Sequence, residues 1–455
     1  MPGEVQSLVR HPAQHIFDHT PESLAQWFAQ RGSQAFRAKQ VLEWVYAKGV
    51  VDPAAMTNLA KRDRDLLSAE MVFLSGDVLR DQLATDGTRK LLVQWRDFAG
   101  PQSSRDEARP APDHAAPVPP GEEHPGHEQP GDARAKSIAL PLAGTISPGI
   151  VSSAKGDAGV APPIGEDSTR QTECVMIPAE SKISEVQRRT ACISSQIGCP
   201  VGCKFCASGL GGLDGNLSAG RIVEQVWLLR HAMRAAPVRG SRPLAASDAV
   251  RGREREFPRI THVVFMGMGE PLANFNNVTN AVRTLAALWG MGISARRITI
   301  STVGLPPMIE RLAAELEVPV TLALSLHAPT DDVRRSLIPW AEYTTIDALL
   351  AACDKWFQRT GREITLEYTL LRGVNDRPEQ AEQLAKVAKR LRARINLIRY
   401  NEVRGIEFGR PRTEDVLEFQ RVLQARGLKA SIRASRGRDI AAACGQLRHE
   451  TAAGV

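Results

Sequence analysis

The sequence predicts an α/β fold of six βα units that follow a small helical module. The alternation of strand-like and helix-like segments indicates the βα units. Downstream of about residue 180, short runs rich in β-branched residues alternate with amphipathic helical stretches. The six runs cover residues 189–195, 260–266, 296–302, 318–326, 363–371 and 394–400. Strands that alternate with helices form parallel sheets whose faces the helices cover. Such a sheet is a partial barrel or doubly wound, and in both cases functional residues gather at the carboxyl ends of the strands.

The first 88 residues are predicted to form the helical module. Residues 20–32 begin with a Thr20 cap and place Leu24, Trp27 and Phe28 on one helical face, and residues 35–49 have a similar pattern. We therefore assign residues 1–88 to a small helical accessory domain.

A proline-rich segment interrupts a predicted β-hairpin at residues 89–180. The hairpin strands are the apolar runs at its two ends, 89–98 and 172–179. Between them, residues 101–170 contain 12 of the 29 prolines and neither an aromatic residue nor a cysteine. A segment that can bury so little apolar surface is predicted to be disordered. The βα region then spans 181–450, with a second polar insertion at 235–256.

The charge of the chain is unevenly distributed. The formal net charge is +7, but residues 101–170 hold six basic and ten acidic residues, which leaves +11 for the rest of the chain. Residues 389–438 hold 14 basic and five acidic residues. Such a stretch is either a solvated helix face or a binding surface for a polyanion.

The composition favours a soluble cytoplasmic protein. The amino-terminal residues lack the apolar core of a signal peptide, and no run of about 18 apolar residues occurs. Seven cysteines in such a chain indicate metal or redox chemistry rather than a disulfide framework. Of these, Cys174 and Cys353 lie in apolar patterns and are predicted to pack in the core.

Three cysteines follow the first predicted strand in one short loop, GCPVGCKFCASG. Cys199, Cys203 and Cys206 have the spacing C-x3-C-x2-C, and no second cysteine pair completes the four ligands of a structural zinc site. Three thiolates in one loop suit a [4Fe–4S] cluster with one iron left open for another ligand. A zinc-stapled RNA-binding protein is the non-enzymatic alternative.

Polar and glycine residues follow the next three predicted strands. Gly267 and Gly269 permit close backbone approach, and Glu270 can accept a hydrogen bond from an ammonium group. Ser301 ends the third strand, and Ser325 and His327 end the fourth. Each of these side chains alone is as consistent with a helix cap as with a ligand contact, but their convergence at one edge favours ligand contacts.

The chain resembles the RlmN/Cfr family of radical-SAM adenosine methyltransferases. The resemblance rests on the segments GCPVGCKFCASG, FMGMGEPLANFNNV, ITISTVGLPPMI, LALSLHAPTDDVRRSLIP, YTLLRGVND and RASRGRDIAAACGQL, in this order. It covers nearly everything outside the two insertions. It implies a partial (βα)6 TIM-like radical-SAM barrel, with a [4Fe–4S] cluster and S-adenosylmethionine as cofactors. It also implies that residues 1–88 help to bind RNA.

The resemblance also implies roles for individual residues. Cys199, Cys203 and Cys206 would hold the cluster. The residues that would contact S-adenosylmethionine are Gly269, Glu270, Ser301, Ser325, Leu326, His327 and Asn401. Cys444 would be the cysteine that becomes methylated, Cys192 the partner that forms a transient disulfide with it, and Glu173 the proton acceptor.

The implied activity is methylation of C2 of an adenosine in 23S rRNA and of an adenosine in tRNA. One S-adenosylmethionine would methylate Cys444 and a second would yield a 5′-deoxyadenosyl radical, in a ping-pong scheme. Because C2 of adenine is an electron-poor carbon and not a nucleophile, a radical route is needed. A flavodoxin-like reductant would serve the cluster, and the enzyme would act as a monomer with no membrane partner. Arg433, Arg436 and Arg438, which precede Cys444, are expected to contact RNA phosphates.

Two other enzymatic readings use the same cysteine loop. Methylation at C8 of the same rRNA nucleotide, as in the Cfr branch, uses the same cysteines, but the segments DGTRK and ECVMIP favour C2. Another radical-SAM enzyme, such as an activase, gives no reason for the pair formed by Cys192 and Cys444.

Overall fold

The computed structural model describes residues 10–98, 170–179, 188–235 and 257–447. The predicted proline-rich insertion therefore lies outside the described residues except for Arg170, and the polar insertion does so except for Ala235. The described residues belong to one compact unit of the chain. No helix among them is long and apolar enough to cross a membrane.

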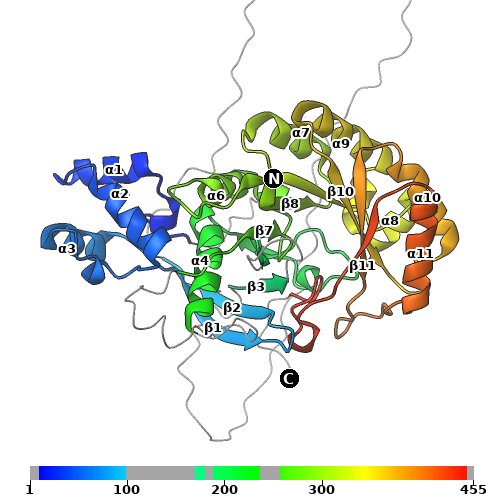
Figure 1. Cartoon of the computed structure of the whole chain (residues 1–455), viewed down its shortest axis with the longest axis horizontal. Helices are drawn as coiled ribbons and strands as arrows, with labels where there is room; N and C mark the ends of the chain where they lie inside the picture. The colour runs from blue at the N-terminus through cyan, green and yellow to red at the C-terminus, as the bar shows by residue number, and fades with distance from the viewer. Residues whose placement is uncertain (1–9, 99–169, 180–187, 236–256, 448–455) are drawn as a thin grey trace, which may run out of the picture. The chain divides into compact units, whose positions relative to one another are not determined.

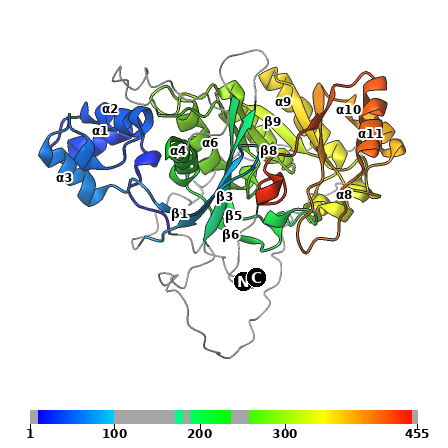
Figure 2. The ribbon, with the colours of Figure 1, turned by 60° about the horizontal axis from the view of Figure 1, so that its bottom comes forward.

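One ten-stranded sheet organises the described part of the chain, with the strands in the order β1-β2-β3-β4-β7-β8-β9-β10-β11-β12. The first four strands pair with one another in antiparallel fashion, and from β4 onward every neighbouring pair is parallel. The strands are β1 (Gly76–Leu83), β2 (Arg89–Trp95), β3 (Gln171–Ala179), β4 (Arg188–Cys192), β7 (His262–Phe265), β8 (Ile298–Thr302), β9 (Thr321–Ser325), β10 (Ile364–Leu370), β11 (Ala393–Arg399) and β12 (Ala430–Arg433). Figures 1 and 2 show this sheet from two directions.

The six predicted βα units are confirmed, and with β12 they form the parallel part of the sheet. Helices follow the strands and cover the outer side of the sheet (Figure 1). They are α4 (Ala219–Ala235), α6 (Phe275–Ala286), α7 (Pro306–Glu315), α8 (Asp331–Leu337), α9 (Ile346–Thr360), α10 (Pro378–Ala388) and α11 (Thr413–Ala425). Short helical turns complete the connections, at η5 (Ala207–Gly209), η6 (Pro271–Asn274), η7 (Ala295–Arg297), η8 (Pro339–Tyr343) and η9 (Arg438–Ile440). This is the partial α/β barrel that the sequence predicts.

The sequence did not predict two strands at the edges of the sheet. β12 is four residues long and only its first residue is buried, so it lacks an apolar run. β1 has mostly exposed residues and lies inside the range 1–88 assigned to the helical module. Both strands form by pairing with a neighbour, β11 and β2 respectively, and this pairing is not visible in local sequence.

The amino-terminal part is helical up to Glu70, as predicted. It contains η1 (Ile16–Asp18), α1 (Pro21–Gln30), α2 (Arg37–Leu42), the π-helical turn η2 (Glu43–Lys48), η3 (Pro53–Ala55) and α3 (Lys61–Glu70). The predicted Thr20 cap is present, because Thr20 Oγ1 accepts from the Ser23 N–H at 3.2 Å and Ser23 Oγ accepts from the Thr20 N–H at 2.9 Å.

The helical part shares its core with the barrel helix α4. Trp227 Nε1 of α4 donates to the Val45 carbonyl at 3.0 Å, and the buried His15 lies 3.1 Å from the Glu224 carboxylate. The apolar residues around these two contacts, from the helical part and from α4, belong to one continuous apolar cluster. The division of the chain at residue 88 remains a proposal.

Candidate active site

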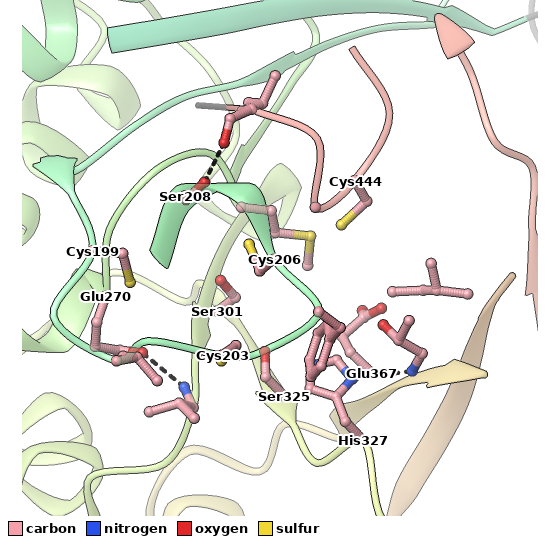
Figure 3. A pocket seen from close by; sticks show the side chains of 18 of the residues that line it. Cys199, Cys203, Cys206, Ser208, Glu270, Ser301, Ser325, His327, Glu367 and Cys444 are labelled. Carbon is pink, nitrogen blue, oxygen red and sulfur yellow. Dashed lines mark hydrogen bonds between the residues drawn. The ribbon is translucent and has the colours of Figure 1, made fainter. Parts of the chain in front are cut away.

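A cavity of about 140 Å³ opens at the carboxyl ends of the parallel strands. Its lining side chains come from the loops after β5 (Gln196–Gly198) and β7, from the ends of β8 and β9 and the residues that follow them, from β10, from the end of β11 and the residue after it, and from the last described segment of the chain. The cavity is shown in Figure 3, where the labelled side chains are Cys199, Cys203, Cys206, Ser208, Glu270, Ser301, Ser325, His327, Glu367 and Cys444. The sheet topology thus gathers polar residues at the edge where a parallel sheet is expected to place them.

The cysteine loop begins at a glycine that no other residue could replace without strain. Gly198 ends β5 (Gln196–Gly198), which pairs with β6 (Leu213–Asn216). Its φ is +75°, and a Cβ there would lie 2.0 Å from the Gly212 carbonyl oxygen. The next residue, Cys199, donates its N–H to the same oxygen at 2.8 Å. The close approach of the two strands therefore sets where the cysteine loop starts.

The three loop thiols are free and line the cavity together. Burial raises the pKa of the Cys199 thiol to about 12. Burial also holds the pKa of Cys203 well above its ordinary value, and the neighbouring thiols Cys206 and Cys199 raise it further. Apolar side chains, including Val201 and Phe205, pack around them. Thiolates in such a site need a bound cation to be stable.

The loop after β7 passes close to the end of β4. A Cβ on Gly267 would lie 2.7 Å from the Ile193 carbonyl oxygen, and a Cβ on Gly269 would lie 2.7 Å from Ser195 Oγ. Gly269 also has a φ of +99°. The glycines therefore permit the close backbone approach that the sequence predicts at this position.

Glu270 is buried, and its carboxylate holds two loops together. Oε1 accepts from the Leu272 N–H at 3.0 Å and Oε2 accepts from the Val303 N–H at 2.7 Å. Burial raises the pKa of Glu270 to about 7, although these hydrogen bonds act in the opposite direction. Thr302 also hydrogen-bonds this carboxylate, so one of its four lone pairs remains for a donor in the cavity.

The ends of β8 and β9 bring two hydroxyls and an imidazole to the same cavity. Ser301 Oγ donates to the Phe265 carbonyl at 2.5 Å, and Ser325 lines the cavity beside it. His327 has a φ of 57°, and its Nδ1 accepts from the Thr369 N–H at 3.0 Å. The proton of the neutral ring is therefore on Nε2. Burial lowers the pKa of His327 to about 3, with a smaller contribution from Arg334.

Two residues assigned to S-adenosylmethionine do not line this cavity. The Leu326 side chain is buried in the apolar core, and its N–H donates to the Glu367 carbonyl at 3.1 Å. Asn401 lines an adjoining cavity of about 430 Å³, and its Nδ2 donates to the Cys444 carbonyl at 3.3 Å. Leu326 would therefore contact the cofactor through its backbone. Asn401 would contact it only where the two cavities meet.

Cys444 lies where the two cavities meet, and it lines both. Its side chain is exposed within them, yet protein groups surround it closely, and this desolvation raises the pKa of the thiol while Arg433 acts to lower it. Burial raises the pKa of Cys192 to about 12, and the Cys444 thiol raises it further. The two sulfurs are thus near enough to influence each other.

Glu173 lies on β3, outside the lining of both cavities. Its Oε1 is 2.6 Å from Lys90 Nζ, and both side chains are almost fully buried. Lys90 Nζ also donates to the Ala441 carbonyl at 3.3 Å. The ion pair therefore connects β3 to the segment that bears Cys444.

Comparisons with known proteins agree in pointing to one family. The family model of the ribosomal RNA large subunit methyltransferase N-terminal domain matches residues 14–72, and that of the radical SAM superfamily matches residues 193–386. The dual-specificity RNA methyltransferase RlmN of Dichelobacter nodosus is 35% identical over 95% of this chain and 93% of its own length. The chain belongs to the RlmN family.

Further relatives of the RlmN family match over almost the whole chain. The dual-specificity RNA methyltransferase RlmN of Sorangium cellulosum is 36% identical over 97% of this chain and 96% of its own length. The crystal structure of a radical SAM methyltransferase from Sphaerobacter thermophilus aligns with a TM-score of 0.71 and 34% identity, over 96% of this chain and all of that one.

Membership of the radical SAM superfamily implies a [4Fe–4S] cluster and S-adenosylmethionine, and the cysteine loop fits the cluster. Among the residues that the structure describes, no three His, Cys, Asp or Glu side chains form a group that could hold a metal ion. In a cubane cluster each protein thiolate binds a different iron, so the thiols need to surround one shared space rather than one ion. Cys199, Cys203 and Cys206 all face one cavity.

Glu367, which the sequence motifs of the RlmN family did not single out, also lines this site. It lies in β10, where every residue is buried, and it lines both cavities. Burial raises the pKa of its carboxyl group, while Arg433 acts to lower it. A single acidic residue inside the apolar run ITLEYTL was the available signal, because carboxylates are rarely buried without a function or a partner.

Proposed function

We propose that this RNA methyltransferase of the RlmN family methylates C2 of an adenosine in 23S rRNA and of an adenosine in tRNA. One observation supports it most. A solvent-accessible thiol, Cys444, lies in the cavity that the three loop cysteines line, and it is near enough to a second, buried thiol, Cys192, to raise the pKa of that thiol. A covalent methyl relay needs two such thiols, whereas a site that only binds a cofactor does not.

The cavity supplies separate groups for the cluster and for S-adenosylmethionine. Cys199, Cys203 and Cys206 would hold the [4Fe–4S] cluster, which when reduced and bound to S-adenosylmethionine supplies a 5′-deoxyadenosyl radical. The residues proposed to contact S-adenosylmethionine are Gly269, Glu270, Ser301, Ser325, Leu326, His327 and Asn401. Within this set, the Glu270 carboxylate suits the ammonium group, and the His327 Nε2–H, fixed by the bond from Thr369, is a hydrogen-bond donor.

Cys444 is proposed to carry the methyl group. Its sulfur accepts a methyl group from one S-adenosylmethionine, which leaves as S-adenosylhomocysteine. Hydrogen abstraction from this methyl group would leave a radical on the carbon bonded to the Cys444 sulfur, and this carbon adds to C2 of the adenine. Loss of the C2 proton and of one electron, which the oxidised cluster would accept, gives a thioether between Cys444 and the base. Attack by the Cys192 thiolate on the Cys444 sulfur then forms a disulfide and breaks the bond from sulfur to the methylene carbon, which takes up a proton to give the methylated base. Reduction of that disulfide resets the two thiols.

Glu173 is proposed to accept the proton from C2. Its carboxylate is held by Lys90, whose other contact is the Ala441 carbonyl, three residues before Cys444. Because Glu173 lies outside both cavities, its role is tested separately from that of the cysteines. In E173Q, the adduct between Cys444 and the base is expected to accumulate, whereas unchanged turnover would exclude Glu173 as the acceptor.

The RNA is proposed to approach from the Cys444 side of the barrel. Arg436 lines the larger cavity and Arg438 follows it, both exposed, so they suit phosphate contacts. Arg433 instead lies within the site, next to Cys444 and Glu367. The target adenosine must leave its stack to reach Cys444. We further infer a monomer in the cytoplasm, where both RNA substrates are found, served by a flavodoxin-like reductant.

The decisive experiment follows deuterium from S-adenosylmethionine into RNA. With a trideuterated methyl donor, the relay through Cys444 predicts adenosine methylated at C2 by a group with two deuterium atoms, and 5′-deoxyadenosine with one. Methylation at C8 would assign the Cfr-type reaction instead. A trideuterated methyl group in the RNA would contradict the radical relay, since direct transfer keeps all three deuterium atoms. Iron and sulfide analysis checks the cluster, and zinc without sulfide would refute it.

A further inference from the structure

One oxygen of Glu367 has no hydrogen-bond partner although it is buried. Glu367 is 3% exposed, and its Oε2 contacts neither a donor nor solvent. A buried carboxyl oxygen without a partner is unfavourable by roughly 1–3 kcal/mol. Glu367 lines both the smaller and the larger cavity, and Figure 3 shows it among the side chains around the same space as Cys444. Oε2 is therefore an unused hydrogen-bonding atom on a side chain that lines both cavities.

The other oxygen of Glu367 is fixed by a hydrogen-bond chain across three parallel strands. In the sheet register, Glu367 of β10 lies opposite Asn396 of β11, which lies opposite Ser431 of β12. Asn396 Nδ2 donates to Glu367 Oε1 at 3.0 Å, and Ser431 Oγ donates to Asn396 Oδ1 at 2.9 Å. This chain makes Oε1 an acceptor and leaves Oε2 as the position for a proton.

The surroundings of Glu367 match a substrate site rather than a structural ion pair. Arg433, on β12, is close enough to influence the pKa of Glu367 but donates to Met266 Sδ at 3.2 Å. The larger cavity, about 430 Å³, holds far more than one solvent molecule, which occupies about 30 Å³. Cys444 lines this cavity too. A base that reacts at Cys444 would therefore lie next to Glu367.

We propose that Glu367 reads the Watson–Crick edge of the target adenine, with Oε2–H donating to N1 and Oε1 accepting from the N6 amino group. This inference rests on the proposed function, because it presumes that an adenine enters the cavity. Oε1 can accept from the amino group and from Asn396 at once, since it has two lone pairs. The burial that raises the pKa of Glu367 favours the protonated form that this contact requires.

The arrangement explains selection of adenine over guanine. In the same pose guanine places a carbonyl oxygen opposite Oε1 and an N1–H opposite Oε2–H, so acceptor would face acceptor and donor would face donor. Asn396 prevents the carboxyl group from reversing its polarity, because its amide hydrogen already points at Oε1. N1 is bonded to C2, so this contact also holds the reacting carbon near Cys444.

The test compares Glu367→Ala, Glu367→Gln and the control Glu363→Gln on an RNA fragment. Glu363 begins the same run but is exposed and paired with Arg394, so its variant should behave like the wild type. A glutamine amide offers the same donor and acceptor, so E367Q should retain kcat/KM within about tenfold. E367A should lose about tenfold to hundredfold, as is usual for one bidentate base contact. Thermal unfolding verifies that each variant is folded.

A second substrate identifies the contacted atom. RNA with 1-deazaadenosine at the target position lacks the N1 acceptor, so its kcat/KM relative to adenosine should fall further in the wild type than in E367A. The comparison cancels any change in the intrinsic reactivity of C2. E367Q should remain sensitive to the deaza base, because its amide still donates to N1. If E367A does not fold, the deaza sensitivity of E367Q is compared with that of the wild type instead.

The outcomes separate this inference from the proposed function. Equal deaza sensitivity in wild type and E367A, or E367Q as impaired as E367A, would overturn the base contact. Methylation of Cys444 by S-adenosylmethionine without RNA should be the same in all variants, and its loss in E367A would assign Glu367 to the cofactor and also overturn it. Absence of C2 methylation by the wild type would instead refute the proposed function.

Discussion

The backbone N–H of Ala207 donates to the carbonyl oxygen of Gly445 at 2.8 Å. Ala207 follows Cys206 and Gly445 follows Cys444, so this bond ties the loop of the three proposed cluster ligands directly to the segment that carries the proposed methyl acceptor. Ser208 Oγ adds a second tie, to the Leu447 carbonyl at 2.6 Å. Figure 2 shows the red end of the described chain next to the hairpin of β5 and β6, which flanks the cysteine loop.

Removal of the second tie should slow methyl transfer without releasing the cluster. In S208A the Leu447 carbonyl loses its side-chain donor, which weakens the attachment of the Cys444 segment to the cysteine loop by about 1 kcal/mol. We expect kcat/KM for RNA to fall about fivefold while iron and sulfide contents stay unchanged. Ser336, an exposed residue of α8 whose hydroxyl donates to the Val333 carbonyl, provides the control S336A. An RNA methylation rate in S208A equal to that of S336A would show that the tie has no role.

A methyl group at Gly198 should prevent the cysteine loop from forming. The Cβ of alanine would lie 2.0 Å from the Gly212 carbonyl oxygen, at a φ of +75° that alanine rarely adopts. We expect G198A to destabilise the protein by about 3 kcal/mol or more and to lose iron. In G211A the new Cβ meets no atom within 4 Å, so iron content and thermal stability should match the wild type. Normal iron loading of G198A would contradict this account of the loop.

Glu270→Gln should weaken the joint between the loops after β7 and β8. Leu272 and Val303 both donate backbone N–H groups to this side chain, one to each oxygen. A glutamine has one oxygen, so one donor would face an NH2 group, and the free energy of unfolding should fall by about 2 kcal/mol. Urea unfolding measures this, and S-adenosylmethionine binding should weaken in parallel. The exposed pair of Glu310 with Lys355 provides the control E310Q, which should change stability by less than about 1 kcal/mol. Equal stability of E270Q and E310Q would refute the proposal that Glu270 holds the two loops together.

His327 should make the protein less stable in mild acid. Its pKa is about 3 in the folded state against an ordinary value near 6.5, because the charged ring is desolvated. The unfolded chain therefore binds a proton between these pH values that the folded chain does not, so stability falls as pH falls. Between pH 7 and pH 5 this residue should remove about 2 kcal/mol from the free energy of unfolding.

The variant His327→Asn isolates this contribution. Asparagine tolerates the left-handed backbone at φ 57°, and its oxygen can accept from Thr369 as Nδ1 does, but it does not titrate. Urea unfolding at pH 7 and pH 5 should show a smaller loss in H327N than in the wild type, by about 2 kcal/mol. Identical losses would mean that His327 is protonated in the folded protein.

The local sequence predicted the elements that have a strong pattern. Six strands were visible as β-branched runs, and the Thr20 cap and the hairpin of β2 and β3 were visible from residue type and alternation. Cys174 and Cys353 are fully buried, as their apolar surroundings predicted. β1 and β12 were missed, because pairing with a neighbouring strand forms them and their own residues are mostly polar or exposed.

The sequence by itself determined which residues follow each strand, and hence the cysteine loop, the glycines before Glu270 and the polar ends of β8 and β9. These depend on spacing along a short stretch of chain. Only the tertiary structure decided that Ser208 and Leu447, 239 positions apart, are hydrogen bonded, so that Cys444 reaches the cysteine loop. Only the register of β10 with β11 decided that Glu367 faces the cavity and has one oxygen free. Strand alternation allows either face, and the packing of the whole sheet selects one.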